Sequence, residues 1–157
     1  MTLKAIDPKG ARTEERRTLG RTAAWLAKQV EIGLGAVDLS LPQYRVLSML
    51  EGTSALSSDL AERLAVRPPT VTAVVDGLVT RGLVERRTVE GDRRRVDHVL
   101  TRHGRQVLDA ADTAVNIRLC EIAGHLHSPA ETDRAFEGLT LWRRAMVASR
   151  LARTSPR

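Results

Sequence analysis

Arginine side chains gather in one stretch of the 157-residue chain, between residues 81 and 105. The stretch holds eight arginines and four acidic residues, so it contributes +4 of the formal net charge of +6. Guanidinium groups bind phosphates through paired hydrogen bonds, so such a run favours a polyanionic partner, either nucleic acid or an anionic membrane surface. A solvated basic surface without a partner is the alternative. The arginines are Arg81, Arg86, Arg87, Arg93, Arg94, Arg95, Arg102 and Arg105.

Residues for catalysis or metal binding are sparse. Cys120 is the only cysteine, so the chain can form neither an internal disulfide nor a cysteine-based metal cluster. We interpret Cys120 as a buried, unreactive thiol rather than an oxidation sensor, because its neighbours are aliphatic and no lysine lies beside it to activate it. His125 and His127 are two residues apart and would point to different sides of a helix, so we predict no metal site.

Enzymes of the common classes are not indicated. The sequence contains no Ser-His-Asp or Cys-His grouping, no glycine-rich phosphate loop and no paired carboxylates at a recognisable spacing. We therefore predict neither an enzyme nor a bound cofactor. No apolar run fits a signal peptide or a membrane span, so we expect a cytoplasmic protein with no membrane partner.

Two short helices precede the arginine-rich stretch. Ser57 begins a pattern that predicts a helix over 57–65, and Pro68-Pro69 opens a second over 68–81, where proline is tolerated because the first N–H groups lack helical partners. Two short helices joined by a tight turn match a helix-turn-helix, whose second helix enters the major groove of DNA.

A β-hairpin follows the second helix directly. Residues 83–89 and 95–101 alternate as strands do, and Glu90-Gly91-Asp92 is a turn signal between them. A hairpin at this place forms the wing of a winged helix-turn-helix. Arginines at its tip would reach a narrow minor groove, whose negative potential attracts them. The charge therefore lies where a DNA-binding protein needs it.

Longer helices flank this lobe. Apolar residues at helical spacing predict helices over 13–34, 102–127 and 130–152, with Gly33 and Gly35 ending the first. Capping-box patterns at Ser40–Gln43 and Ser128–Glu131 predict two helix starts, and Thr101 is expected to cap the helix over 102–127. The buried stripe predicted for the helix over 68–81 is Val71, Val74, Val75 and Leu78. Together they carry more apolar surface than one small lobe could cover, which indicates a homodimer. The predicted fold class is mainly α with a small β-hairpin wing: a winged helix-turn-helix with N- and C-terminal dimerisation helices. We divide the chain into a flexible arm (1–12), an N-terminal dimerisation helix (13–38), a DNA-binding lobe (39–101), C-terminal dimerisation helices (102–152) and a tail (153–157).

Short motifs follow one another in a fixed order through this lobe. With them, over roughly residues 15–150, the chain resembles the MarR family of bacterial regulators. The motifs are Leu41-Pro42-Gln43-Tyr44-Arg45-Val46-Leu47, Leu60-Ala61-Glu62-Arg63-Leu64, Pro69-Thr70-Val71-Thr72, Val75-Asp76-Gly77-Leu78, Arg81-Gly82-Leu83-Val84-Glu85-Arg86, Asp92-Arg93-Arg94 and Leu100-Thr101-Arg102-His103-Gly104.

The resemblance implies a triangular homodimer in which the first and the last two helices form the interface. It also implies that Asp92 and Arg94 form a wing-tip pair, with the arginine entering the minor groove and the aspartate orienting it. The residues expected to contact DNA are Ser57, Arg67, Pro69, Thr70, Thr72, Ala73, Arg86, Asp92, Arg93, Arg94 and Arg95.

Three positions depart from the family pattern. Arg67 stands where a small polar N-cap is usual, which loses a cap worth about 1 kcal/mol and offers a phosphate contact instead. Ala73 and Gly77 stand where long polar or basic side chains are common. The second helix is therefore poor in side chains that read bases by paired hydrogen bonds, and we expect the wing and DNA shape to carry more of the specificity.

The resemblance further implies a small-molecule effector, often a phenolic or other aromatic compound. Trp25, Tyr44 and Trp142 are the candidates to line its pocket, with packing at the dimer interface as the alternative for the two tryptophans. We thus predict a sequence-specific regulator of transcription that binds double-stranded DNA, a ligand-responsive repressor acting as a homodimer on a pseudo-palindromic operator. When it is bound to DNA, we expect it at the bacterial nucleoid. A dimeric winged-helix module that binds RNA or protein is the alternative.

Overall fold

The computed structural model describes residues 14–89 and 92–154, and only the backbone of residues 14–17, 89, 92–95, 150–151 and 153–154. The arm predicted for residues 1–12 lies outside the described residues, as do residues 90–91 of the predicted turn and 155–157 of the predicted tail. The chain forms two compact units, Met1–Arg118 and Leu119–Arg157. Within the described residues, no helix is long and apolar enough to cross a membrane.

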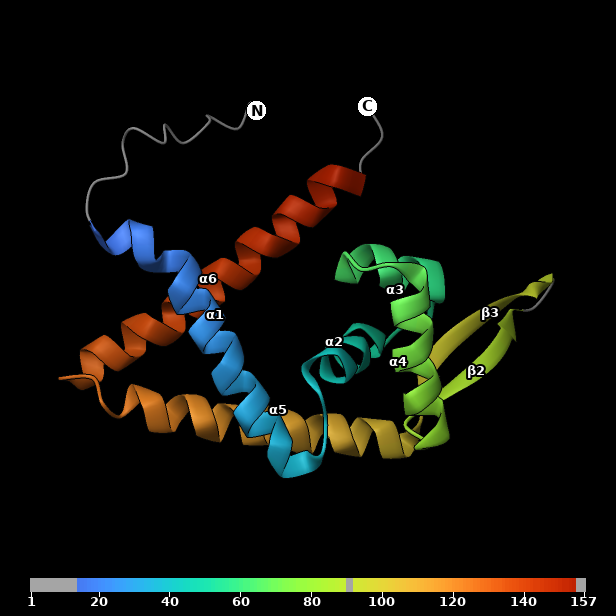
Figure 1. Ribbon diagram of the computed structural model, residues 1–157, viewed down its shortest axis with the longest axis horizontal. Helices are drawn as coiled ribbons and strands as arrows, with labels where there is room; N and C mark the ends of the chain where they lie inside the picture. The colour runs from blue at the N-terminus through green and yellow to red at the C-terminus, as the bar shows by residue number, and fades with distance from the viewer. Residues whose placement is uncertain (1–13, 90–91, 155–157) are drawn as a thin grey trace. The chain divides into compact units, whose positions relative to one another are not determined.

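The architecture is mainly helical with one small antiparallel sheet, so the predicted fold class is confirmed (Figure 1). The β2–β3 hairpin extends away from the helices of its unit (Figure 1). The elements are α1 (Glu14–Leu34), the 3-10 turn η2 (Gly35–Val37), α2 (Leu41–Leu50), β1 (Ala55–Leu56), α3 (Ser57–Leu64), α4 (Pro68–Thr80), β2 (Val84–Val89), β3 (Asp92–Leu100), α5 (Arg102–Ala123) and α6 (Pro129–Thr154).

The first helix ends as predicted at Leu34, but Gly33 has a different role from the one expected. Gly33 lies inside α1, where a Cβ would come within 3.1 Å of the Val115 Cα on α5. It is therefore a point of close helix–helix approach. The chain turns at Asp38, which adopts the left-handed conformation (φ 51°) after the 3-10 turn and accepts a hydrogen bond on its carbonyl from Arg81.

Helix α2 begins with the predicted capping box. The Ser40 hydroxyl accepts from the Gln43 backbone N–H at 3.4 Å, and the side-chain Oε1 of Gln43 accepts from the Ser40 backbone N–H at 2.9 Å. This satisfies two backbone donors at the helix start. The buried core of the first unit is aliphatic, as the composition required. Its fully buried side chains include Leu34, Val46, Leu47, Leu50, Leu60, Val71, Val75, Leu78, Leu83, Val84 and Leu108.

The sheet has three strands in the order β1-β3-β2, one more than predicted. Strand β1 has only two residues, so it carries no alternating pattern that a sequence could reveal. It pairs antiparallel with β3, Ala55 opposite His98 and Leu56 opposite Asp97. Strand β3 also starts three residues earlier than predicted, at Asp92. The extra strand fixes the start of α3 to the wing, because α3 follows β1 without a gap.

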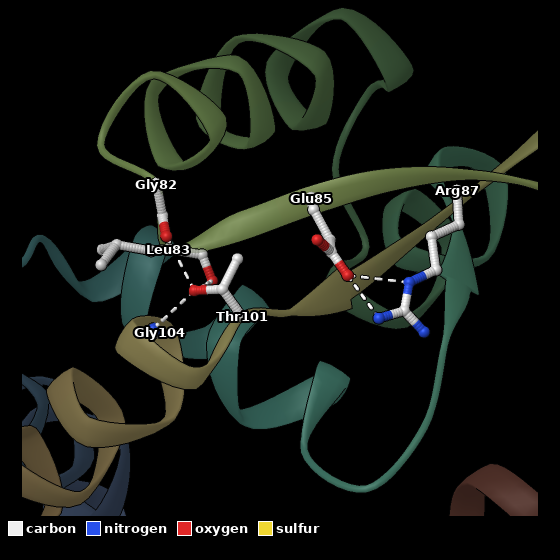
Figure 2. Close-up of polar contacts among 6 residues, drawn as sticks. All are labelled: Gly82, Leu83, Glu85, Arg87, Thr101 and Gly104. Carbon is white, nitrogen blue, oxygen red and sulfur yellow. Dashed lines mark hydrogen bonds and ion pairs between the residues drawn. The ribbon is translucent and has the colours of Figure 1, made fainter.

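The wing and α5 meet at Thr101 (Figure 2). Its hydroxyl donates to the Gly82 carbonyl at 2.7 Å and accepts from the Gly104 N–H at 2.9 Å, so it caps α5 as predicted. Gly82 turns the chain from α4 into β2 in the left-handed conformation (φ 68°), which glycine adopts without strain. A Cβ on Gly104 would lie 1.9 Å from the Leu83 carbonyl oxygen, so this approach requires glycine.

The end of α5 corrects two expectations. The helix stops at Ala123, four residues before the predicted end. Cys120 is exposed rather than buried, because the buried face of α5 runs through Leu108, Ala111 and Val115, and residue 120 is rotated well away from that stripe.

Helix α6 begins with a variant of the predicted capping box. The Ser128 hydroxyl accepts from the Glu131 N–H at 3.3 Å, but the Glu131 carboxylate accepts from the His127 N–H, one residue before the cap.

Candidate nucleic-acid interface

The turn between α3 and α4 is tight and polar contacts define it. Ala65 ends α3 in the left-handed conformation (φ 54°), and its N–H reaches the Glu62 carbonyl at 3.1 Å. Arg67 occupies the N-cap of α4 in extended conformation and makes no side-chain capping bond, and Pro68 starts the helix. The two helices pack through Leu60, Leu64 and the buried stripe of α4, so the turn sets the angle at which α4 is presented.

Helix α4 has one buried face and one exposed face. Val71, Val75 and Leu78 are buried, as predicted, while Val74 is only half-buried. On the opposite face, the residues in the first turns of α4 matter most, because the N-terminal residues of a recognition helix contact base edges. The predicted DNA-contacting residues of α4 are all exposed there: Pro69, Thr70, Thr72 and Ala73.

The exposed face of α4 offers small groups only. The Thr72 hydroxyl donates to the Pro68 carbonyl at 3.2 Å, so its lone pairs stay available to accept from a base amino group. Methyl groups of threonine and alanine suit contact with the thymine methyl group. Gly77 leaves room, since a Cβ there would come no closer than 3.9 Å to any atom of its surroundings.

Two further predicted contacts lie at helix starts. Arg67 is exposed and makes no side-chain capping bond, and its contact with a backbone phosphate stays a prediction. Ser57, the first residue of α3, is half-buried, and its Oγ lies 2.8 Å from the Nε2 of His98.

Part of the basic charge of the wing is neutralised within the lobe. Arg86 of β2 pairs with the Asp76 carboxylate of α4, which joins the wing to the recognition helix. Arg87 donates from Nε to the Glu85 carboxylate at 2.8 Å on the same strand (Figure 2). Arg81 lies 3.6 Å from the Asp38 carboxylate. Arg86 is therefore a structural ion-pair partner between β2 and α4 as well as a candidate DNA contact. The sequence did not suggest this structural role.

The wing tip carries the remaining predicted contacts. The backbone of β3 begins at Asp92, opposite Val89, after an irregularity in the ladder at Thr88. The side chains of Asp92, Arg93, Arg94 and Arg95 lie outside the described residues. Their contact with DNA stays a prediction.

The candidate pocket residues lie in different surroundings. Trp25 on α1 is 70% exposed and Trp142 on α6 is 65% exposed. Tyr44 on α2 is half-buried, and its hydroxyl donates to the Asp112 carboxylate of α5 at 2.5 Å. Burial, followed by the hydrogen bond and negative charge of Asp112, raises the pKa of Tyr44 to about 12. Tyr44 therefore links α2 to α5.

His98 is the functional candidate that sequence reasoning missed. It is 4% exposed and is the one buried polar residue among those that the structure describes. Burial and the nearby positive charge of Arg86 lower the pKa of His98, while the carboxylates of Asp97 and Asp76 oppose the shift. The alternating pattern of β3 could have predicted that His98 is buried, because His98 and Leu100 lie two residues apart and so share the inward face. Within the described ranges, no group of three or more His, Cys, Asp or Glu residues is arranged to hold a metal ion.

The chain is similar in sequence and in fold to known proteins. A family model described as MarR family matches residues 37–95. The chain is 32% identical over 121 residues to the uncharacterized HTH-type transcriptional regulator YfiV of Bacillus subtilis, covering 73% of this chain and 75% of that protein. It is 28% identical over 116 residues to the HTH-type transcriptional repressor Rv2887 of Mycobacterium tuberculosis, covering 73% and 84%. The crystal structure of RV1404 from Mycobacterium tuberculosis superposes with a TM-score of 0.71 at 25% identity, covering 83% and 90%.

Proposed function

The chain belongs to the MarR family of DNA-binding transcriptional regulators, and from this premise we propose that it is a ligand-responsive repressor that binds a pseudo-palindromic operator as a homodimer. Members of this family bind DNA and are not enzymes. The observation that carries the proposal is the exposed face of α4, formed by Pro69, Thr70, Thr72 and Ala73, in the same compact unit as the β2–β3 hairpin. Repression is extended to this chain from its relative Rv2887, an HTH-type transcriptional repressor.

The exposed apolar side chains support the homodimer. Three large apolar side chains on α1 are exposed to solvent: Leu19, Trp25 and Ile32. Helix α6 exposes Leu139, Leu141, Trp142, Met146 and Val147. Exposed apolar patches of this kind mark interfaces. We propose that residues 13–38 and 102–152 dimerise and that residues 39–101 form the DNA-binding lobe, so that a two-fold dimer meets half-sites roughly one helical turn apart.

RNA and protein partners are less well supported. Proteins that read RNA rely on exposed aromatic side chains for base stacking. In the described lobe, Tyr44 is half-buried and hydrogen-bonded to Asp112. Phe136 is half-buried on α6, and the exposed Trp25 and Trp142 lie on α1 and α6, outside the proposed lobe of residues 39–101.

Anisotropy of a fluorescent duplex from the chain's own promoter region tests DNA binding. We expect a Kd of about 10⁻⁸ M or tighter at physiological salt, and binding to a scrambled duplex weaker by about 10³-fold. A double-stranded RNA of the same sequence is the control. Equal affinity for promoter, scrambled DNA and RNA would contradict a sequence-specific regulator.

The effector is proposed to weaken operator binding. A small molecule does so only if it binds the free dimer more tightly than the DNA-bound dimer. Trp25, Tyr44 and Trp142 are each candidates for its contact, with packing as the alternative for the tryptophans. Tryptophan fluorescence and operator anisotropy, measured together across phenolic and other aromatic acids, would identify it. A panel that changes neither signal would count against ligand control.

A further inference from the structure

His98 holds an unusual position at the base of the wing. It lies on β3 opposite Ala55 of β1, and β1 leads directly into Ser57. Its Nε2 lies 2.8 Å from Ser57 Oγ. Among the described side chains, its Nδ1 is the one buried nitrogen or oxygen atom with no hydrogen-bond partner. Of the two ring nitrogens, Nε2 therefore has a hydrogen-bond partner and Nδ1 has none.

This arrangement selects a tautomer. If Nδ1 carried the proton, a buried N–H would have no acceptor, and Ser57 would have to donate its hydroxyl hydrogen to Nε2. Orphaned buried N–H groups are rare because they lose their full hydration, whereas acceptors tolerate this better. With the proton on Nε2, the ring donates to Ser57 Oγ and leaves the serine hydroxyl hydrogen free.

We propose that His98 is a positioning residue for DNA binding, which donates from Nε2 to Ser57 Oγ and so leaves the Ser57 hydroxyl to donate to a phosphate oxygen of the operator. The inference rests on the proposed function and on Ser57 as a DNA contact. Ser57 is half-buried, so part of the residue faces solvent while its hydroxyl contacts the ring. Serine hydroxyls are common donors to phosphate and fix the register of a protein on the duplex.

Neighbouring contacts keep Ser57 in place. Ser54 donates from its hydroxyl to the Asp97 carboxylate at 2.7 Å, beside the β1–β3 pairing. The wing backbone and the first residue of α3 are thus joined twice, by the short sheet and by His98. Of the charged groups near the ring, Arg86 favours the neutral imidazole, and Asp97 and Asp76 favour its protonation. Burial has the largest effect on the pKa of His98 and lowers it, so the ring is neutral at pH 7 and can donate from Nε2 alone.

The tautomer is measured directly on the wild-type protein. Long-range ¹H–¹⁵N correlation spectra of the imidazole at pH 7 should show Nε2 protonated and Nδ1 unprotonated. A ring protonated on Nδ1, or on both nitrogens, would overturn the proposal. This measurement needs neither DNA nor a variant, so its result does not depend on whether a substituted chain folds.

Matched substitutions test the consequence for binding. The amide nitrogen of glutamine reaches the place of Nε2, whereas that of asparagine reaches only Nδ1. His98→Gln should bind operator within about twofold of wild type, and His98→Asn and Ser57→Ala about five- to tenfold more weakly. The double variant of His98→Asn and Ser57→Ala should lose no more than either alone, because His98 acts through Ser57.

Each other outcome is decisive. Ser57→Ala binding like wild type, losses that multiply in the double variant, or His98→Gln binding as weakly as His98→Asn would each overturn the role of His98 while leaving operator binding intact. Wild-type protein that binds no operator would overturn the proposed function as well. Circular dichroism and melting curves confirm that each variant is folded at the temperature of the assay.

Discussion

Individual side chains at the DNA-facing surface differ in what they can contribute. Threonine and alanine on α4 give methyl groups and hydroxyls, which distinguish few bases. Arginine at a wing tip gives a full charge, which neutralises a phosphate or enters a narrow minor groove. We therefore expect Arg94 to contribute mainly to affinity and Thr72 mainly to base discrimination.

Arg94→Ala should weaken operator binding by about 1–3 kcal/mol and lower the salt slope by about one counterion. It should also reduce the preference for A·T-rich flanks, because narrow minor grooves attract arginine. A salt titration on operator and scrambled DNA, with a melting curve, measures both effects. Unchanged operator affinity at every salt concentration would mean that the wing assignment is wrong, and unfolding would mean that Arg94 is structural.

Thr72→Ala should have the opposite profile. Thr72 is exposed and opposite the buried stripe of α4, so melting should change little. Discrimination at one major-groove position per half-site should relax, with little change in salt slope. Affinities for operators substituted base by base would show this. A Thr72→Ala protein with the specificity profile of wild type would remove Thr72 from the reading surface.

The buried ring of His98 predicts how stability depends on pH. Its folded-state pKa lies below the ordinary value of 6.5, chiefly because of burial. As pH falls through about 6.5, the unfolded chain takes up a proton that the folded chain does not, so the stability from neutral His98 is present above that pH and is lost progressively below it. Urea unfolding of wild type at pH 7.5, 6.5 and 5.5 should show the loss.

His98→Gln is the control for this titration, because His103, His125 and His127 are common to both proteins. Its free energy of unfolding should vary less over the same pH range. Equal pH dependence in the two proteins would assign the effect to other groups.

At the scale of the elements, the joint between the wing and α5 depends on one glycine. Gly104→Ala would place a Cβ 1.9 Å from the Leu83 carbonyl oxygen, which is backbone and cannot rotate away. We expect a loss of about 1–3 kcal/mol in stability, since α5 and the start of β2 must move apart. Weaker operator binding should accompany the loss, because β2 carries the wing. Chemical denaturation measures the change.

Gly20→Ala is the matched control on another helix. Gly20 lies within α1, and a Cβ there meets nothing within 4 Å. Alanine should therefore stabilise the protein by about 0.5–1 kcal/mol through helix propensity alone. If Gly104→Ala also stabilised it, the close contact with Leu83 would not constrain the joint.

Local sequence signals predicted most of these elements. The Ser40 capping box, the prolines that open α4, Gly82 and Thr101 each act within four residues of their own position, so their chemistry is legible in the sequence. Strand β1 was missed because two residues form a strand only by pairing with β3. The exposure of Cys120 and the His98–Ser57 bond depend on which face packs and which segments meet, and neither is encoded by neighbours in the chain.

At the scale of the whole molecule, the apolar surface of single helices has to be explained. Leu139, Trp142 and Met146 follow one another on α6 at spacings of three and four residues, so they form one stripe. All three are exposed, Met146 at 59%. Exposure of such an apolar stripe to water is unfavourable. In the proposed homodimer, a second copy of the chain would cover it.

Met146→Glu tests that occupant. A carboxylate buried without a partner costs several kcal/mol, so the dimer should dissociate about 100-fold more readily, while circular dichroism of the monomer stays unchanged. Operator affinity should fall in parallel, because one lobe can fill only one half-site. Thr140→Glu adds the same charge at an exposed position off the stripe and should remain dimeric. Sedimentation equilibrium across micromolar concentrations distinguishes the two variants. If Met146→Glu stays as dimeric as wild type, the α6 stripe is not the dimer surface. If the wild-type chain is itself a stable monomer, the proposed homodimer is wrong, and a lobe that binds DNA alone would have to read a single half-site.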